Sequence, residues 1–194
     1  MIQNLSIAIK APTVKLNKQV LQKLVHAYET RQTRKWKVLP DGTEFRQMKA
    51  PSSMGTYFGI IVYDKKVIGY VLVQKVVVPS KPKLRCWMVV QSYLVPEIRG
   101  VGIMNKLYSL IIDSGRLVAS PTMTQAARSM WISRIKTDQR RIYAVWDTQN
   151  SFVHVDSRLI SLMKNSIFDG SAKTFLLAFQ KNDPSLKRLH FLDK

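Results

Sequence analysis

The sequence predicts a mixed α/β fold, in which a mostly antiparallel sheet carries helices on both faces. Residues 57–63, 67–78 and 84–95 are rich in Val, Ile and aromatic residues and follow one another as three strand-like segments. After residue 102 the spacing of apolar residues changes from about two to about 3.6, which is typical of a helix. Helical and strand-like segments then alternate to residue 179. This order favours a meander followed by mixed connections over a regular parallel α/β sheet.

Length and composition set the broad class. With 194 residues, of which 46% are hydrophobic, we expect one domain spanning 1–194 with a sizeable core. Cys86 is the only cysteine and lies in an apolar run, so we expect a buried thiol, no internal disulfide and no metal site. No apolar run reaches the length of a transmembrane helix, and the first residues do not resemble a signal peptide. We therefore expect no membrane partner and a cytoplasmic location.

The first 56 residues contain fewer clear elements. Residues 5–9 alternate weakly and predict a short strand. Asn17 is a suitable N-cap, flanked by Leu16 and Leu21 at the spacing of a hydrophobic staple, which predicts a helix ending near residue 32. Residues 33–56 have no clear period and predict a long loop of the functional or flexible kind.

The later elements follow from turns and periodicity. Asp64, Lys65 and Lys66 predict a hairpin turn between the first two of the three strands. Gly115 is a candidate for the left-handed residue that ends the helix after residue 102. We then expect a strand at 116–120, a helix capped by Ser120 or Thr122, a strand at 142–146, a helix at 156–165 and a strand at 174–179.

Two glycines stand between the third strand and the next helix. Pro96 closes the strand, and Gly100 and Gly102 precede the helix. Glycine adopts left-handed dihedral angles and lets a ligand approach the backbone. The N–H groups of residues 100–104 are therefore expected to form a phosphate-binding helix N-terminus, with Arg99 beside it.

The segment 95–107 resembles motif A of the GNAT family of N-acetyltransferases, often written Pro-Glu-x-Arg-Gly-x-Gly-Ile-Gly. The resemblance covers about residues 55–147 and looks closest to phage-encoded members, through segments 117–121 and 127–131. It implies an acyl-CoA N-acyltransferase-like fold that uses acetyl-CoA or another acyl-CoA, located in a bacterial host cell if phage-encoded. The cofactor-binding residues that it implies are Leu94, Val95, Arg99, Gly100, Val101, Gly102, Ile103, Met104 and Thr124.

A family enzyme also needs a group that accepts a proton from the amine. The candidates are Tyr93, Glu97 and Asp147. Three positions differ from the usual family residues: Met104 replaces Gly or Ala, Thr124 replaces an asparagine, and Trp131 replaces the tyrosine that protonates the leaving thiolate.

One further pair of side chains has two interpretations. His154 and Asp156 are two residues apart in a strand-like stretch and could share a face as a base and its orienting group. Asp156 is also a suitable N-cap for the helix at 156–165, which is the simpler explanation.

The charge of the chain indicates a polyanionic partner. Lys and Arg number 31 against 12 Asp and Glu, a formal net charge of +19, and nucleic acid is the commonest partner of so basic a domain. Arg34, Lys35, Trp36 and Lys37 combine charge with an aromatic ring, which suits phosphate contacts and base stacking. Arg140 and Arg141 belong to a second candidate patch.

Three functions remain open from the sequence. The first is an acetyl-CoA-dependent N-acyltransferase acting on nucleic acid or another polyanion, as in phage-type modification. The second is a catalytically inactive GNAT-fold protein that binds nucleic acid or serves as a phage structural or accessory protein, which the residues at 104, 124 and 131 favour. The third is a small-molecule or peptide acetyltransferase whose acceptor pocket is shaped by residues 33–56.

Overall fold

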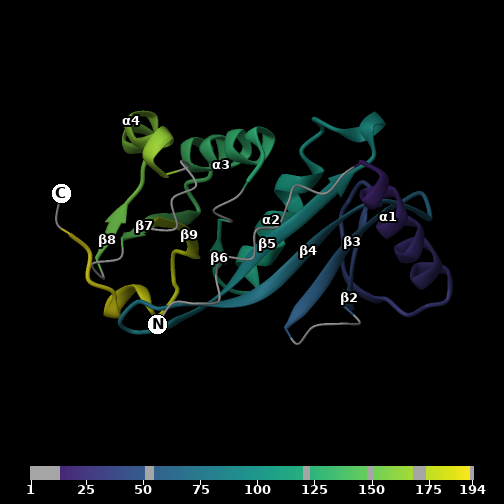
Figure 1. Ribbon diagram of the computed structural model, residues 1–194, viewed down its shortest axis with the longest axis horizontal. Helices are drawn as coiled ribbons and strands as arrows, with labels where there is room; N and C mark the ends of the chain where they lie inside the picture. The colour runs from purple at the N-terminus through teal and green to yellow at the C-terminus, as the bar shows by residue number, and fades with distance from the viewer. Residues whose placement is uncertain (1–13, 51–54, 120–122, 148–150, 168–173, 193–194) are drawn as a thin grey trace.

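The computed structural model describes residues 14–50, 55–119, 123–147, 151–167 and 174–192 (Figure 1). The predicted strand at 5–9 and the predicted caps Ser120 and Thr122 lie outside these residues. The helices are α1 (Val14–Glu29), α2 (Ile103–Asp113), α3 (Gln125–Thr137) and α4 (Ser157–Ile167), with 3-10 turns at Pro96–Ile98 and Leu186–Arg188. The strands are β1 (Arg34–Val38), β2 (Glu44–Lys49), β3 (Thr56–Tyr63), β4 (Lys66–Val78), β5 (Leu84–Leu94), β6 (Leu117–Val118), β7 (Arg141–Asp147), β8 (Phe152–His154) and β9 (Thr174–Gln180).

The strands form one sheet in the order β1-β2-β3-β4-β5-β6-β9-β7-β8. Among the described strands, β5 and β6 form the parallel pair, and the other neighbours are antiparallel. The parallel contact is short, since it joins Trp87 to Leu117 and Met88 to Val118. Beyond Met88, β5 continues to Leu94 beside β4 alone. The sheet therefore opens at this point (Figure 1).

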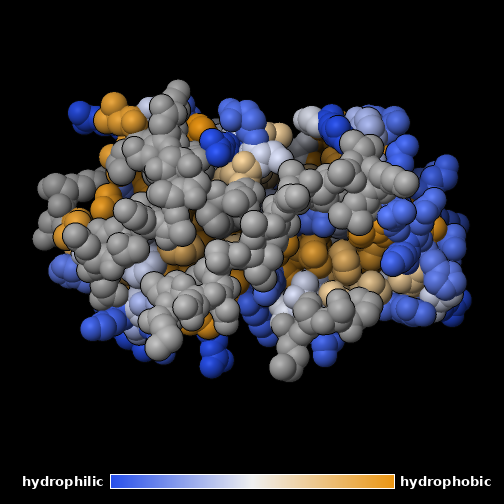
Figure 2. All heavy atoms as spheres, viewed as in Figure 1, coloured by the Kyte–Doolittle hydropathy of each residue, from blue (hydrophilic) through white to orange (hydrophobic). Residues whose placement is uncertain are grey.

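Helices cover both faces of the first half of the sheet. Ile60 and Ile61 are neighbours in β3 and both are fully buried, because a strand alternates its side chains between faces. Ile60 packs with Leu24 of α1, whereas Ile61 packs in a cluster with Leu107 of α2. Figure 2 shows hydrophilic side chains over α1, at the right of the view, and hydrophobic ones over the strands beside it. The predicted mixed, mostly antiparallel fold with helices on both faces is confirmed.

In the described residues, the second half of the sheet carries its α-helices on one face and the C-terminal segment on the other. Trp131 of α3 and Ile160 of α4 pack in the same core cluster as Tyr143 of β7, on the side that also carries α2. The opposite face holds Phe179 of β9, which packs in a cluster with Leu189 of the C-terminal segment. The chain after β9, which includes the 3-10 turn at Leu186–Arg188, thus covers this face.

The prediction of a long loop at 33–56 is wrong, because this region contains the hairpin β1–β2. Four of the five side chains of β1 are exposed. The segment therefore lacks the alternation of hydrophobic and polar residues by which a strand is recognised in a sequence. Its pairing with β2 holds it at the sheet edge, and β2 in turn pairs with β3. The helix α1 also begins at Val14, so Asn17 lies inside it instead of capping it.

Turns were predicted with mixed success. The predicted hairpin turn is confirmed: Asp64 and Lys65 have positive φ angles, of 46° and 58°, and Lys66 is already the first residue of β4. Gly115 does not have a positive φ; α2 ends at Asp113, and its C-cap is Ser114, whose hydroxyl donates to the carbonyls of Leu110 and Ile111. The capping role of Asp156 is confirmed, because Oδ1 accepts from two backbone N–H groups at the start of α4.

Candidate functional site

A cleft of about 1200 Å³ opens where β5 separates from β6. Its walls come from α1, the end of β5, the turn at 96–102, the start of α2 and the start of α3. Ten of the residues predicted from the sequence line it: Tyr93, Leu94, Val95, Glu97, Arg99, Gly100, Gly102, Ile103, Met104 and Thr124. Residues that are distant in the sequence thus surround one space.

A β-bulge bends β5 just before the cleft. Leu72 of β4 pairs with Gln91, whereas the next residue, Val73, pairs with Val89, so Val90 is the extra residue of the bulge. A bulge increases the local twist and turns a strand away from its neighbour. Because β6 ends its pairing at Met88, one edge of the bent segment pairs with none of the described strands. Its backbone is therefore available to an extended ligand.

The glycine turn has the predicted backbone conformation. Gly100 has φ 88° and Gly102 has φ 78°, and a Cβ at either position would have no atom within 4 Å. Gly102 is the N-cap of α2, and the helix's first backbone bond runs from Lys106 N–H to the Gly102 carbonyl, at 3.2 Å. The N–H groups before Lys106 therefore have no partner within the helix, which favours an anion at this position.

Arg99 turns back towards the strand. Its Nε donates to the Leu94 carbonyl at 3.0 Å, and its guanidinium lies 5.9 Å from the centre of the Tyr93 ring. The contact joins the end of β5 to the glycine turn and keeps a positive charge on the cleft wall. Val101, which the resemblance also implied, is 62% exposed and is not part of the described lining.

Tyr108 is a cleft residue that the sequence analysis missed. It lines the cleft from α2 and is only 4% exposed. Burial raises its pKa well above the usual value, although the hydrogen bond with Ser92 and the charge of Arg134 lower it. The hydroxyl therefore stays protonated at neutral pH. Met104 and Tyr108 are four residues apart, a spacing that places them on one helical face and could have identified Tyr108.

The three residues that depart from the family pattern have different positions. Trp131 is 3% exposed, and its ring meets those of Tyr108 and Tyr143 edge-on at 6.4 Å each, so it is a core residue. Thr124 caps α3 by accepting from the Ala127 N–H at 3.3 Å. Met104 lies at the cleft wall, half-buried against the core.

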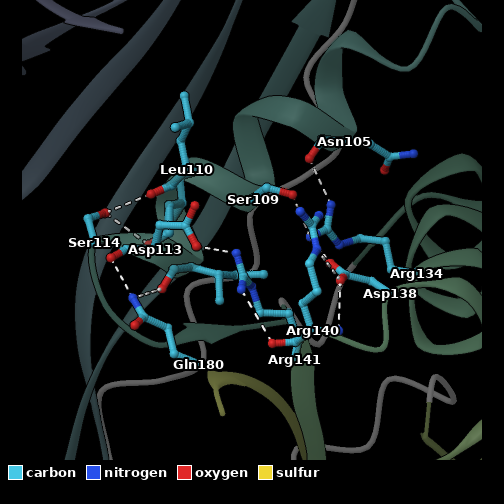
Figure 3. A network of polar contacts seen from close by, with 12 residues as sticks. Asn105, Ser109, Leu110, Asp113, Ser114, Arg134, Asp138, Arg140, Arg141 and Gln180 are labelled. Carbon is cyan, nitrogen blue, oxygen red and sulfur yellow. Dashed lines mark hydrogen bonds and ion pairs between the residues drawn. The ribbon is translucent and has the colours of Figure 1, made fainter. Parts of the chain in front are cut away.

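A polar network joins α2 to α3 and to the second half of the sheet (Figure 3). Arg134 is 4% exposed; it donates to the Asn105 carbonyl at 2.8 Å and to the Ser109 hydroxyl at 3.0 Å. Asp138 lies 3.4 Å from the same guanidinium. Since Asn105 is in the first turn of α2, this buried arginine supports the helix end that carries the glycine turn.

The predicted proton acceptors do not all lie together. Tyr93 and the exposed Glu97 line the cleft. Asp147 ends β7, which is separated from β5 by β6 and β9, and its side chain lies outside the described part of the structure. The catalytic roles of all three stay predictions.

The two predicted basic patches lie near opposite ends of the sheet, on β1 and at the start of β7. In the first patch Arg34 and Lys37 are exposed, whereas Lys35 lies 3.6 Å from Glu44. In the second patch Arg140 contacts Asp138 at 3.3 Å, and Arg141 pairs with Asp113. The partners of the second patch reduce the charge that it could present to phosphates, and nucleic-acid binding by either patch stays a prediction.

Two other questions from the sequence concern metals and membranes. The His154 ring stacks on Phe191 at 4.1 Å, and Asp156 caps α4, so their arrangement fits structural roles. Within the described residues no group of three His, Cys, Asp or Glu side chains could hold a metal ion. None of the helices in that part of the chain has the length and apolar character to cross a membrane.

Comparisons with known proteins leave the family open. No family model and no curated protein sequence matches the chain. One similar solved structure is described as an acetyltransferase of the GNAT family from Bacteroides thetaiotaomicron, with 11% identity, coverage of 71% of this chain and 70% of that chain, and a TM-score of 0.36. Another is Arabidopsis thaliana Naa50 in complex with the bisubstrate analogue CoA-Ac-MVNAL, with 8% identity, coverage of 62% and 70%, and a TM-score of 0.32. At these identities and TM-scores neither likeness establishes a family, a cofactor or an activity for this chain.

Proposed function

We propose that this protein is an acyl-CoA-dependent N-acyltransferase, with acetyl-CoA as the acyl donor. The observation that carries the proposal is the cleft itself, in which the glycine turn before α2 lies beside the open edge of β5. The glycine turn suits the pyrophosphate of coenzyme A, and the open edge of β5 suits its extended pantetheine arm. The GNAT resemblance of residues 95–107 supports the same assignment.

Each step of the proposed reaction is assigned to a group of this chain. Acyl-CoA supplies an acyl group activated as a thioester. The N–H groups at the start of α2 bind the pyrophosphate, and the backbone of residues 93–95 orients the donor. Tyr93 or Glu97 accepts the proton of the amine, and the Tyr108 hydroxyl donates a proton to the leaving group. Tyr108 is thereby the proposed proton donor to the thiolate. Trp131 cannot serve as that donor, because an indole N–H does not act as an acid.

The acceptor is proposed to be nucleic acid or another polyanion, modified as in phage-encoded relatives of the resembled family. The net charge of +19 supports this substrate class. The exposed Arg34 and Lys37 add unpaired positive charge on β1, as far as the described residues show.

A non-catalytic protein with the same fold is the second candidate. The burial of Trp131 favours it, since that position offers no proton donor to the cleft. Such a protein would bind nucleic acid, or act as a phage structural or accessory component, through charge alone.

Isothermal titration with acetyl-CoA separates the two candidates. The enzyme is expected to bind in the micromolar range and to acetylate an amine-bearing polyanion. Absence of binding at millimolar acetyl-CoA, together with a salt-sensitive shift of an oligonucleotide, would overturn the enzyme assignment and support the second candidate.

A further inference from the structure

A second, smaller pocket of about 260 Å³ lies at the C-terminal end of α2. Ile111 and Ser114 line it from the helix, whereas the cleft lies at the N-terminal end of the same helix. The remaining walls come from strands β1 to β5, and none of the lining residues described for it is shared with the cleft. We call it the aromatic pocket, formed chiefly by Trp36, Gln47, Tyr57, Lys75, Trp87 and Ser114.

Three aromatic side chains from three strands surround this pocket. Tyr57 of β3 and Trp87 of β5 meet edge-on, with 5.6 Å between ring centres. Trp36 is the extra residue of a bulge in β1, because the residues on either side of it pair with Arg46 and Phe45. A bulge redirects a side chain, and Trp36 packs half-buried beside the core. The bulge thus brings a third ring from an otherwise exposed edge strand.

Lys75 gives the pocket a positive charge. Its Nζ lies 5.2 Å from the centre of the Trp87 ring and 5.8 Å from that of Tyr57. Within the described residues, no carboxylate forms an ion pair with it. The aromatic faces that would bind a cationic ligand already hold a cation, so a second cation would be repelled. An aromatic ligand that carries negative charge fits both the rings and the lysine.

More positive charge lies on the same face of the sheet. Residues directly opposite each other in antiparallel strands have side chains on one face. Arg34 is opposite Gln47, and Lys49 is opposite Tyr57, so both basic residues lie on the pocket side. Glu44 is opposite Val62, which packs with α1 on the other face. The acidic side chain of the hairpin is therefore turned away from the pocket.

From this arrangement we propose that the aromatic pocket binds one base of single-stranded nucleic acid. The base stacks against the indole of Trp36, and the Gln47 amide is available for its hydrogen-bonding edge. Arg34, Lys49 and Lys75 contact the adjacent phosphates. Stacking on aromatic rings together with a basic track is the usual means of binding single strands. The proposal rests on the polyanionic partner of the proposed function, and it does not need acyl transfer.

Fluorescence anisotropy of a labelled single-stranded oligonucleotide tests the pocket. Trp36→Ala is expected to weaken binding at least about fivefold, because one stacking contact is lost. Trp36→Phe keeps a ring and should bind more nearly like the wild type. Lys75→Gln should lower the salt dependence of binding, with a slope smaller by about one. Tyr63→Ala is the matched control, since this exposed aromatic residue lies at the far end of β3.

Two results would overturn the proposal. The first is that both Trp36→Ala and Lys75→Gln bind the oligonucleotide with wild-type affinity. The second is that tetramethylammonium, a cationic ligand, quenches the tryptophan fluorescence more strongly than the oligonucleotide does. Lys75 is exposed, so its variant stays informative even if Trp36→Ala does not fold. A duplex that binds as tightly as the single strand would also contradict base stacking.

Titration of the same variants with acetyl-CoA separates this inference from the proposed function. If oligonucleotide binding weakens while acetyl-CoA affinity is unchanged, the result supports base binding by the aromatic pocket and says nothing about acyl transfer. Unchanged oligonucleotide binding with intact acetyl-CoA affinity overturns the pocket and leaves the acyltransferase proposal standing.

Discussion

Arg134 and Asn105 connect α3 to the first turn of α2, since the arginine Nη1 donates to the asparagine carbonyl at 2.8 Å. The guanidinium is buried and also contacts Ser109 and Asp138 (Figure 3). A buried donor of this kind is expected to stabilise the fold and to set the position of the glycine turn.

Replacing Arg134→Met removes that donor and leaves the Asn105 carbonyl and the Ser109 hydroxyl without it. We expect the free energy of unfolding to fall by about 1.5–3 kcal/mol, measured by urea denaturation. Arg140→Met is the control; its side chain is 77% exposed, and the loss should stay below about 1 kcal/mol. Equal small losses in both variants would contradict the supporting role of Arg134.

Gly102→Ala tests the anion site. The φ of 78° is unfavourable for alanine, so the variant should lose about 1–2 kcal/mol of stability. It should also bind acetyl-CoA roughly tenfold more weakly in calorimetry, which corresponds to about 1.4 kcal/mol. Gly42→Ala is matched, because Gly42 has φ 80° and equally open surroundings but lies in the β1–β2 turn. A similar loss of acetyl-CoA affinity in both variants would assign the effect to backbone strain.

Tyr108→Phe tests the proposed proton donor. The change keeps the ring that packs against Trp131 and removes the hydroxyl, so stability should change by less than about 1.5 kcal/mol. Turnover is expected to fall about 100-fold while acetyl-CoA affinity stays constant. Tyr63→Phe, on an exposed residue, controls for the substitution itself. Unchanged turnover in Tyr108→Phe would limit this residue to packing.

Stability should decrease at alkaline pH. Burial raises the pKa of Tyr70 from 10.0 to about 12 and that of Cys86 from 9.0 to about 12. Above the unfolded values the unfolded chain loses protons that the folded chain retains, so deprotonation favours unfolding. The stability that these groups contribute is complete below about pH 9 and is lost as the pH rises towards 12.

Urea denaturation at increasing pH measures this fall. Tyr70→Phe should make it shallower, because phenylalanine does not titrate. A free energy of unfolding that is constant up to about pH 11 would contradict the prediction.

Local signals carried the correct predictions. Strands β3, β4 and β5 were recognised from β-branched and aromatic residues, and the turn at Asp64 and Lys65 from its short polar connection. Gly100 and Gly102 were recognised as a turn between a strand and a helix, where glycine tolerates left-handed angles, and both have positive φ. Each signal lies within a few residues of the structure that it specifies.

The missed features depend on partners distant in the sequence. The strand β1 has mostly charged side chains and exists because β2 pairs with it. Tyr108 lines the cleft because β5 separates from β6 beside it. Trp131 is a core residue because its ring packs against those of Tyr108 and Tyr143.

The sequence by itself thus determined the turn between β5 and α2. Its signals, two glycines followed by apolar residues at helical spacing, lie within about ten residues of each other. Only the tertiary structure decided what surrounds that turn. The cleft lies where the β5–β6 pairing ends early, just beyond the bulge at Val90, and the buried Arg134 contacts the first turn of α2 beside it. The aromatic pocket likewise needs β1, β3 and β5 side by side. Pairing between strands that are distant in the sequence is a long-range contact, and a local turn predicts it only for adjacent strands such as β3 and β4.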